Sequence, residues 1–544
     1  MNRVILFLAL LTIGSAAFSQ TVADGEKLMY YERWKGAEQV FEKMIKNDPS
    51  NLDAYYWLTE AYIEDKDMNE AGDVQKQLET YLAAHPGTEK SNLDKVAEAE
   101  LNLQSGDSAK AMLIFDDLLK KTKEKDPTVL IAIANAWLHT KSPDYQKVLY
   151  LLDKAEKKDR NNPEIFSMRG DVYRRLNNGG EAVQSYQEAL KKDNHFAEAA
   201  YKIGKIYLTQ NNVELFLQNF INAVARDTAY APAYYELYYY YYFRDVNKAK
   251  DYLDHYIANT DPSNENEYMV TDLYFASSKP KEAIEHAKAL VAKEADKVQP
   301  RLYKLIAYSY DQLNDSTQAL QYLDQYFQKE VDTNYVAKDF ELKGKLLAKV
   351  PGKEEDAMQS METAFNMDTS QANKASYASQ LVALAKIAAD KKGEAKWLGM
   401  VYQYKDNPTN LDLYYWGMAN YVSGDFAKAD SVFAMYTDKY PEHIQGFYWR
   451  AKSNAQIDST MENGLAIPYF EKVIEMGSID SLKNKSLLIQ AYGYIGAYEA
   501  NVKKEYDDAL VNFEKILELD PGNSDAMKYR DILKKWVKSE SKPD

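Results

Sequence analysis

Small and large apolar residues recur along the chain with the spacing of an α-helix. An alanine is followed four residues later by a large apolar side chain, and three residues after that by another apolar or small one. The pattern occurs at Ala37/Phe41/Met44, Ala111/Phe115/Leu118, Ala319/Leu323/Tyr326, Ala429/Phe433/Tyr436 and Ala509/Phe513/Ile516. Spacings of three and four place such residues on one stripe of a helix. The sequence therefore predicts an all-α chain of amphipathic helices.

Two adjacent segments show that the pattern has a period of 34 residues. They read "EIFSMRGDVYRRLNNGGEAVQSYQEALKKDN" and, 34 residues further on, "EAAYKIGKIYLTQNNVELFLQNFINAVARDT". Gly170 recurs as Gly204, and Tyr186 recurs as Phe220. Because glycine inside a helix costs roughly 0.5–1 kcal/mol relative to alanine, we predict that a neighbouring helix leaves no space for a Cβ at Gly170 and Gly204.

This skeleton resembles the tetratricopeptide repeat (TPR) family. In that family, the first helix carries an aromatic residue, Leu-Gly and Tyr, the second carries Ala, Phe and Ala, and a Pro follows. Residues 414–441, "YYWGMANYVSGDFAKADSVFAMYTDKYP", match much of this pattern, with Asn420 in place of the first-helix aromatic. About fourteen repeats can be counted over Thr21–Asn523. The resemblance implies a TPR superhelical solenoid of antiparallel helix pairs, each covering its apolar face with the next pair.

The repeat phase also predicts how the chain is organised. The segments are a signal peptide (1–19), the N-terminal part of the array (20–370), a degenerate repeat that could act as a hinge (371–407), the C-terminal part of the array (408–523), a capping helix (524–538) and a tail (539–544). Pro468 lies early in a second helix, which is tolerated only in the first turn. The capping helix would place Leu533 and Trp536 on one apolar stripe.

The first residues, "MNRVILFLALLTIGSAAFSQ", are typical of a secretory signal peptide. Arg3 precedes the apolar run Val4–Ile13, and small residues lead to a cleavage point after Ser19. The run is short for a membrane span, although a short buried helix or an uncleaved anchor is an alternative. No cysteine follows the cleavage point, so a bacterial lipid anchor is excluded. We expect an exported, periplasmic protein that is not a lipoprotein.

The composition limits which classes of binding partner and functional site are expected. The net charge of −16 disfavours nucleic acid but admits a basic partner. The absence of cysteine excludes disulfides, zinc–thiolate sites and thiol nucleophiles. The six histidines do not pair at helical spacing, and no catalytic or phosphate-binding motif occurs. The sequence therefore predicts no metal site, no cofactor and no enzymatic activity.

Seven tyrosines fill nine consecutive positions, 234–242, in the first helix of one repeat. Tyr234 and Tyr238 fall at core positions of the repeat. The resemblance places Tyr235, Tyr239 and Tyr242 on the stripe that lines the concave groove of TPR proteins. With equivalent residues of neighbouring repeats, the predicted ligand-binding patch comprises Tyr201, Tyr235, Tyr239, Tyr242, Tyr268, Phe275 and Tyr308. An extended peptide or a sugar chain would stack on these rings, whereas the alternative is that they serve only for packing.

Six Asp-Ser/Thr pairs recur, mostly where turns between helices are expected. The hydroxyl residues are Ser108, Thr228, Ser316, Ser431, Ser459 and Ser481. Capping of helix N-termini explains these residue types. The pairs also resemble the O-glycosylation sequon of exported proteins of the Bacteroidota, a phylum that the "FSQ" end of the signal peptide resembles too.

Together these features predict a non-catalytic scaffold or adaptor of the bacterial periplasm or cell envelope. Its concave groove would bind proteins or peptides of the envelope, in a role such as secretion or outer-membrane assembly, as the family resemblance implies. The alternative is a module that binds glycan or peptidoglycan through the tyrosine-rich groove.

Overall fold

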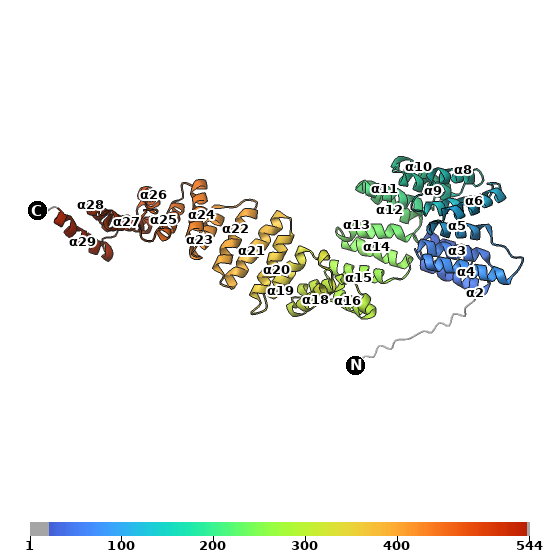
Figure 1. Cartoon of the computed structure of the whole chain (residues 1–544), viewed down its shortest axis with the longest axis horizontal. Coiled ribbons are helices and arrows are strands. Elements are labelled where there is room, and N and C mark those ends of the chain that lie inside the picture. Colours follow the sequence, from blue (N-terminus) through green and yellow to red (C-terminus); the bar gives the residue numbers. More distant parts are fainter. Residues whose placement is uncertain (1–20, 541–544) are drawn as a thin grey trace, which may run out of the picture. The chain divides into compact units, whose positions relative to one another are not determined.

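The computed structural model of the protein describes residues 21–540, and these residues are all-α (Figure 1). The chain divides into two compact units, Met1–Ala295 and Asp296–Asp544. Ala295, at the division, has a positive φ of 51°. This backbone region is unfavourable for a residue with a side chain.

The helices of the first unit are α1 Val22–Tyr30, α2 Trp34–Asn47, α3 Leu52–Glu64, α4 Met68–Ala84, α5 Asn92–Gln104, α6 Ser108–Thr122, α7 Pro127–Leu138, α8 Tyr145–Glu156, α9 Pro163–Arg175, α10 Gly179–Lys192, α11 Ala197–Thr209, α12 Val213–Arg226, α13 Ala231–Tyr242, α14 Val246–Asn259, α15 Asn264–Ala276 and α16 Pro280–Glu294. Those of the second unit are α17 Arg301–Gln312, α18 Ser316–Lys329, α19 Ala337–Leu347, α20 Glu354–Met367, α21 Gln371–Ile387, α22 Lys391–Tyr404, α23 Asn410–Val422, α24 Phe426–Lys439, α25 Ile444–Ile457, α26 Ile467–Gly477, α27 Lys485–Tyr498, α28 Tyr506–Leu519 and α29 Ser524–Glu540.

Consecutive helices pack in pairs, which confirms the predicted solenoid. Helices α1 to α28 form fourteen pairs, and α29 follows them where the capping helix was expected. Pro468 lies in the first turn of α26, as its missing N–H requires. The segment 371–407 forms the pair α21 and α22, which packs on the pairs before and after it; a hinge there stays a prediction.

Close contacts within the pairs explain the repeated glycines. A Cβ at Gly170 would lie 2.4 Å from the ring of Tyr186, and one at Gly204 would lie 2.6 Å from the ring of Phe220. These approaches are too short for any side chain, which confirms the prediction from the 34-residue period. The large ring of the second helix therefore occupies the space that the glycine of the first helix leaves open.

Aspartates cap many of the helices. The carboxylates of Asp107 and Asp315 accept the backbone N–H groups of Lys110 and Gln318 at the starts of α6 and α18. This confirms the capping interpretation for these two Asp-Ser pairs. Ser431 differs, because it lies inside α24 and its hydroxyl donates to the carbonyl oxygen of Ala427.

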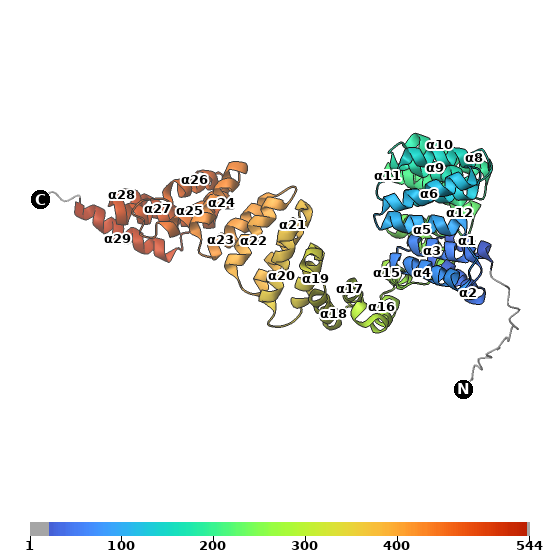
Figure 2. The ribbon, with the colours of Figure 1, turned by 45° about the vertical axis from the view of Figure 1, so that its right-hand side comes forward.

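The first unit also joins its two ends, which the sequence did not predict. The Tyr31 hydroxyl, just after α1, donates to the Asp227 carboxylate at 2.9 Å. Arg33 forms an ion pair of 3.3 Å with Asp261, which also accepts the backbone N–H of Gly36. Figure 2 shows the first helices beside the later helices of the same unit. The first unit thus forms a closed turn of superhelix, beyond the contacts between successive pairs.

Candidate functional site

Closure of the first unit partly encloses a cavity of about 640 Å³. Its walls come chiefly from α1, α3, α7, α9 and α11, the first helices of five pairs. We call it the central cavity. Seven carboxylates line it: Glu26, Glu32, Glu60, Glu64, Glu164, Asp171 and Glu198. Six aromatic side chains line it: Tyr30, Trp34, Tyr56, Trp57, Phe196 and Tyr230. The basic residues among the lining are His139, Arg175 and Lys202.

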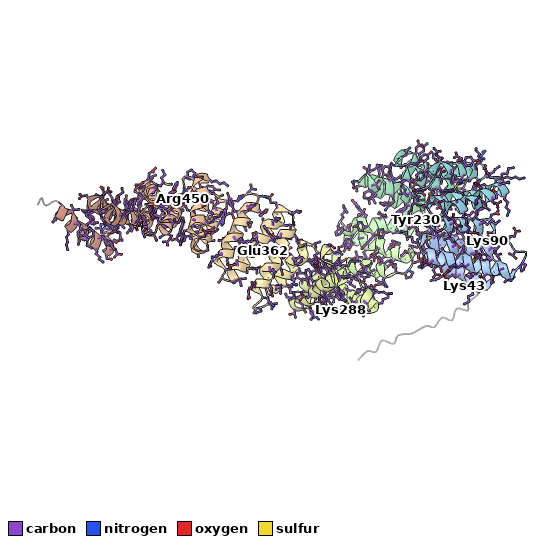
Figure 3. All side chains as sticks on the ribbon, viewed as in Figure 1. Lys43, Lys90, Tyr230, Lys288, Glu362 and Arg450 are labelled. Carbon is purple, nitrogen blue, oxygen red and sulfur yellow. The ribbon has the colours of Figure 1, made fainter. Side chains whose placement is uncertain are left out.

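Aromatic contacts seal the wall where the two ends of the unit meet. The Tyr30 ring lies 5.6 Å from the ring of Phe196 and 5.5 Å from that of Tyr230. The Tyr30 oxygen accepts the backbone N–H of Glu198 at 3.4 Å. Tyr230 is 1% exposed and lies among the helices of the first unit (Figure 3). These contacts hold α1 against the later repeats, so the groove of the first unit becomes a partly enclosed cavity that stays open to solvent.

Lys202 is neutralised within the cavity wall. Its ammonium group lies 2.6 Å from Asp171 and 2.5 Å from Glu198, and it donates to the Ser167 hydroxyl at 3.1 Å. Although burial favours the neutral amine, these two carboxylates raise the pKa of Lys202. Arg175 donates to the carbonyl oxygen of Leu138. The carboxylates of the lining therefore outnumber its basic groups by a wide margin.

Two carboxyl groups that reach water in the cavity have strongly raised pKa values. Enclosure by protein raises the pKa of Glu32 to about 7, and the nearby Glu198 adds to this. Enclosure and Glu198 also raise the pKa of Glu164 to about 7. Both side chains still reach water inside the cavity. They are therefore well placed to meet a ligand that carries positive charge.

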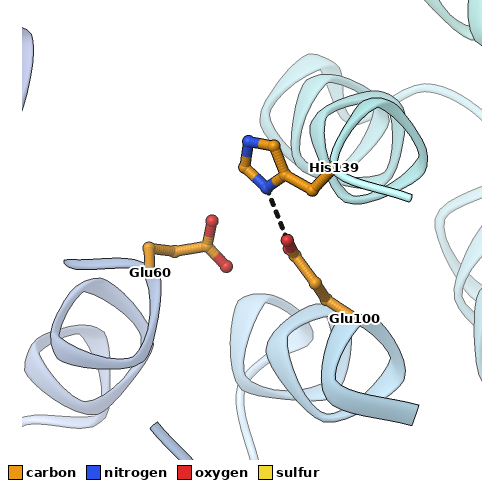
Figure 4. A group of neighbouring side chains, drawn as sticks. All are labelled: Glu60, Glu100 and His139. Carbon is orange, nitrogen blue, oxygen red and sulfur yellow. Dashed lines mark hydrogen bonds and ion pairs between the residues drawn. The ribbon is translucent and has the colours of Figure 1, made fainter. Parts of the chain in front are cut away.

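A buried cluster of titratable residues lies in one wall of the central cavity (Figure 4). Glu60 of α3, Glu100 of α5 and His139, just after α7, offer ligand atoms that all lie within 4.8 Å of one another. His139 Nδ1 lies 2.6 Å from Glu100, and its Nε2 lies 3.0 Å from Glu64. Burial opposes the imidazolium, but these carboxylates raise the pKa of His139 well above its usual value. Burial and Glu100 raise the pKa of Glu60.

This cluster was not predicted from the sequence. The prediction of no metal site depended on histidines three or four residues apart, whereas these residues come from the first helices of three successive pairs. The first helices of successive pairs lie side by side. Aligning these helices by their position in the repeat would therefore indicate that Glu60, Glu100 and His139 lie on neighbouring helices.

The predicted aromatic patch is only partly exposed. Tyr235 and Tyr239 are 41% and 62% exposed, and their rings stack with centroids 6.5 Å apart. Phe243, the residue after α13, is 79% exposed on the same stripe. Phe243 was not among the predicted residues, because it follows the tyrosine run. Tyr235, Tyr239 and Phe243 form a short stripe, which we call the α13 stripe.

The other residues of the predicted patch are buried or half-buried. Tyr201 packs on Phe220 and Tyr230, and the Tyr242 hydroxyl donates to the carbonyl oxygen of Asp272. The remaining three are Tyr268, Phe275 and Tyr308. Tyr268 is 1% exposed, so it lies in the core and not on an open surface. Phe275 is half-buried. Tyr308 belongs to the second unit and donates to the carbonyl oxygen of Lys338.

Sequence models of repeat families match two parts of the chain. Residues 37–206 match a tetratricopeptide repeat-like domain, and residues 413–443 match a tetratricopeptide repeat. The chain is a tetratricopeptide repeat protein. This TPR protein shows no significant sequence match among curated proteins. Among residues 21–540, no helix has both the length and the apolar character to cross a membrane.

Solved TPR structures resemble parts of this TPR protein. The C-terminal part of a TPR repeat-containing protein from Cytophaga hutchinsonii is 29% identical, with 48% of this chain and 98% of that chain covered and a TM-score of 0.29. A TPR protein from Parabacteroides merdae is 16% identical, with coverages of 51% and 93% and a TM-score of 0.23. Because these TM-scores are low, the fold assignment depends on the family models and the helix pairs.

Proposed function

We propose that this TPR protein is a non-catalytic interaction scaffold whose central cavity holds a positively charged segment of a partner protein. A TPR fold is typical of proteins that bind other proteins. The observation that carries the proposal is the lining of the central cavity, in which carboxylates and aromatic rings surround a space of about 640 Å³. This volume is in the range of pockets that enclose small ligands or a few side chains.

Carboxylates supply the attraction for a cationic segment. Glu26, Glu32 and Glu164 reach water inside the cavity, whereas Asp171 and Glu198 already bind Lys202. A lysine or arginine that entered would meet several carboxylates at short range, and salt would weaken the attraction. The attraction would also lower the pKa values of Glu32 and Glu164, so binding would favour their charged forms.

Aromatic rings supply a second recognition element. Trp34, Tyr56 and Trp57 lie in the same lining as the carboxylates. A guanidinium or ammonium group over such a ring gains about 0.5–2 kcal/mol. Carboxylates and rings together favour arginine or lysine side chains over neutral or acidic ones.

The test is the binding of a fluorescent, arginine-rich peptide of about ten residues, measured by anisotropy on chain 20–544. We expect saturable binding that weakens as salt is raised, and no binding of a peptide in which glutamate replaces each arginine. The double variant Glu32→Gln/Glu164→Gln should weaken binding at least tenfold.

The matched control removes the same charge from exposed positions on outward helices, as Glu282→Gln/Glu471→Gln. This control should bind the peptide as the unmodified chain does. Equal loss in the two double variants would mean that only net charge matters, which contradicts a role for the cavity.

A second candidate function is the binding of glycan or peptidoglycan by the α13 stripe. The observation that favours it is the exposed, stacked pair Tyr235 and Tyr239, because sugar rings pack on exposed aromatic faces. A sugar array compared with the Tyr235→Ser/Tyr239→Ser variant separates the two functions. Sugar signals that the variant retains would exclude the stripe.

The cellular setting remains part of the proposal. Residues 1–19, the expected signal peptide, lie outside the described residues. A periplasmic scaffold, in secretion or outer-membrane assembly of a member of the Bacteroidota, agrees with that segment and with the resemblance of the Asp-Ser/Thr pairs to a glycosylation sequon. Ser108, Thr228, Ser431 and Ser459 are exposed enough to be modified. The intact mass of the native protein tests both ideas, since cleavage leaves Gln20 first and each glycan adds mass.

A further inference from the structure

The cluster of Glu60, Glu100 and His139 has features that the binding of a cationic segment in the central cavity does not explain. The three residues come from the first helices of three successive pairs, α3, α5 and α7. Glu60 is 3% exposed and Glu100 is 0% exposed. Buried carboxylates are costly unless they are paired or bind a metal. Two of them beside one imidazole therefore require a physical explanation.

Each of the two glutamates has an oxygen without a partner. Among residues 21–540, neither Oε1 of Glu60 nor Oε2 of Glu100 has a hydrogen-bond partner. No lysine or arginine in this described part pairs with either side chain; the cation at the cluster is His139, which also contacts Glu64. One imidazole thus faces three carboxyl groups, and a metal ion would supply a partner for the two oxygens that have none.

We propose that Glu60, Glu100 and His139 bind a divalent first-row transition-metal ion, for which Zn²⁺ is the best-matched type. One imidazole nitrogen and two carboxylate oxygens are ligands that Zn²⁺ accepts at about 2.0–2.2 Å. Mg²⁺ and Ca²⁺ prefer ligand sets made only of oxygen. Three protein ligands leave a fourth position of a tetrahedral ion open. That position lies toward the central cavity, because Glu60 and His139 line it.

Glu64 contacts the proposed site without being a metal ligand. His139 Nε2 lies 3.0 Å from Glu64, so Nε2–H donates to that carboxylate and leaves Nδ1 to the metal. His139 Nδ1 is now 2.6 Å from Glu100, which is a hydrogen-bond distance. Metal binding replaces this hydrogen bond with bonds from both atoms to the ion and releases the Nδ1 proton. The ion would then tie three successive helix pairs together.

The proposal is tested by titrating ZnCl₂ into chain 20–544, made without a polyhistidine tag and treated with chelator, in an isothermal calorimeter. We expect one tight Zn²⁺ per chain and a measured heat that varies with the ionisation enthalpy of the buffer, because a proton is released. Mg²⁺ at the same concentration should give no saturable binding. The melting temperature of the first unit should rise with Zn²⁺, because the ion binds the folded chain.

Variants separate the site from other metal-binding surfaces. Glu60→Gln and Glu100→Gln should each weaken Zn²⁺ binding at least tenfold, and His139→Asn should abolish it. Glu64→Gln should weaken binding less than the ligand variants. The matched control is His85→Asn, which changes an exposed histidine just after α4 and should leave the affinity unchanged.

Glu60→Gln also keeps the test valid if other variants fold poorly. It removes one of two repelling carboxylates, so the metal-free variant should melt at or above the temperature of the unmodified chain and lose its response to Zn²⁺. Absence of saturable Zn²⁺ binding by the unmodified chain would overturn the proposal. Unchanged affinity in Glu60→Gln and Glu100→Gln would also overturn it, because the ion would then bind elsewhere.

Discussion

The two units of the chain are built from the same repeat but differ in the contacts that their ends make. In the first unit, Arg33 pairs with Asp261 across 228 residues of sequence, and Tyr31 bonds Asp227. In the second unit, side-chain hydrogen bonds join neighbouring pairs, as Tyr448 and Gln490 do across 42 residues. The local rule of packing, a small residue against a large ring, holds in both: a Cβ at Gly417 would lie 2.6 Å from Phe433.

The comparison shows that closure is a property of particular side chains and not of the repeat. Tyr30 and Tyr230 supply the rings that meet at the closure, and Asp227 and Asp261 supply the carboxylates. Closure also changes the chemistry of the inner surface. Surrounding protein, and secondarily the nearby Glu198, raise the pKa values of Glu32 and Glu164 in the central cavity.

The largest expected effect comes from removing a ring of the closure. Tyr230→Ala should destabilise the first unit by about 3–5 kcal/mol, the usual cost of deleting a buried aromatic side chain. Because Tyr230 contacts Tyr30, hydrogen exchange should accelerate in both α13 and the distant α1.

Tyr326→Ala is the matched change in the second unit, where Tyr326 is 2% exposed. It should accelerate exchange only in α18 and the adjoining helices. If Tyr230→Ala likewise left α1 protected, the two units would not differ in the way described.

A smaller effect, equal in both units, should follow from filling the glycine positions. Gly204→Ala and Gly417→Ala each place a methyl group about 2.6 Å from a ring of the paired helix. Overpacking costs about 1–3 kcal/mol, and the better helix propensity of alanine offsets about 0.5–1 kcal/mol of it. Denaturant unfolding of each variant measures the change. A marked loss in one unit alone would show that the pairs are packed differently.

The smallest expected effect is a dependence of stability on pH that belongs to the first unit. Glu32 and Glu164 have raised pKa values of about 7 in the folded state against 4.5 in a free side chain. The folded state therefore binds more protons than the unfolded state between these values, and stability falls as pH rises from about 5 to 8. The raised pKa of His139 acts in the same direction, because its stabilisation is lost as pH rises.

Thermal unfolding at pH 5.5 and pH 8 measures this dependence. Since Glu32 and Glu164 reach water, screening keeps the change small. Glu32→Gln/Glu164→Gln should flatten it, whereas Glu282→Gln/Glu471→Gln should not. A first unit that is more stable at pH 8 than at pH 5.5 would contradict the enclosure of these carboxyls.

The sequence predicted the repeat well because repeat packing is local. Gly170, Gly204 and the alanines at fixed spacing report contacts within a pair, and the count of about fourteen pairs with a final helix is confirmed. The prediction that Tyr234 and Tyr238 are core residues is also confirmed, at 5% exposure each.

Most of the candidate site could not be predicted from the repeat pattern. The central cavity forms because the rotations between seven successive helix pairs add up to a closed turn. No residue that recurs with the repeat indicates how large this total rotation is. Tyr30 and Asp261 contact residues more than five repeats away, so their pairing has no local signature. Tyr268 was assigned to the groove as an equivalent position of the neighbouring repeat, whereas its ring is buried and its hydroxyl donates to Glu294 within the same pair.

Closure of the first unit is the claim on which the central cavity and the proposal of a cationic segment bound in it depend. The chain has no cysteine, so the double variant Gly36→Cys/Asp261→Cys introduces a single pair of thiols. A Cβ at Gly36 would lie 3.1 Å from Asp261 Oδ1, which is within reach of a disulfide. In the control, Gly36→Cys/Asp254→Cys, the second thiol lies within α14, before the turn that carries position 261.

The decisive measurement is non-reducing gel electrophoresis of these two variants after mild oxidation. Closure predicts that the 36/261 variant forms an intramolecular disulfide and runs as a faster, reducible band, because a loop of 225 residues is then closed, while the 36/254 variant does not. If both thiols of the 36/261 variant stayed free and accessible in the folded chain, the first unit would be open and the central cavity would not exist.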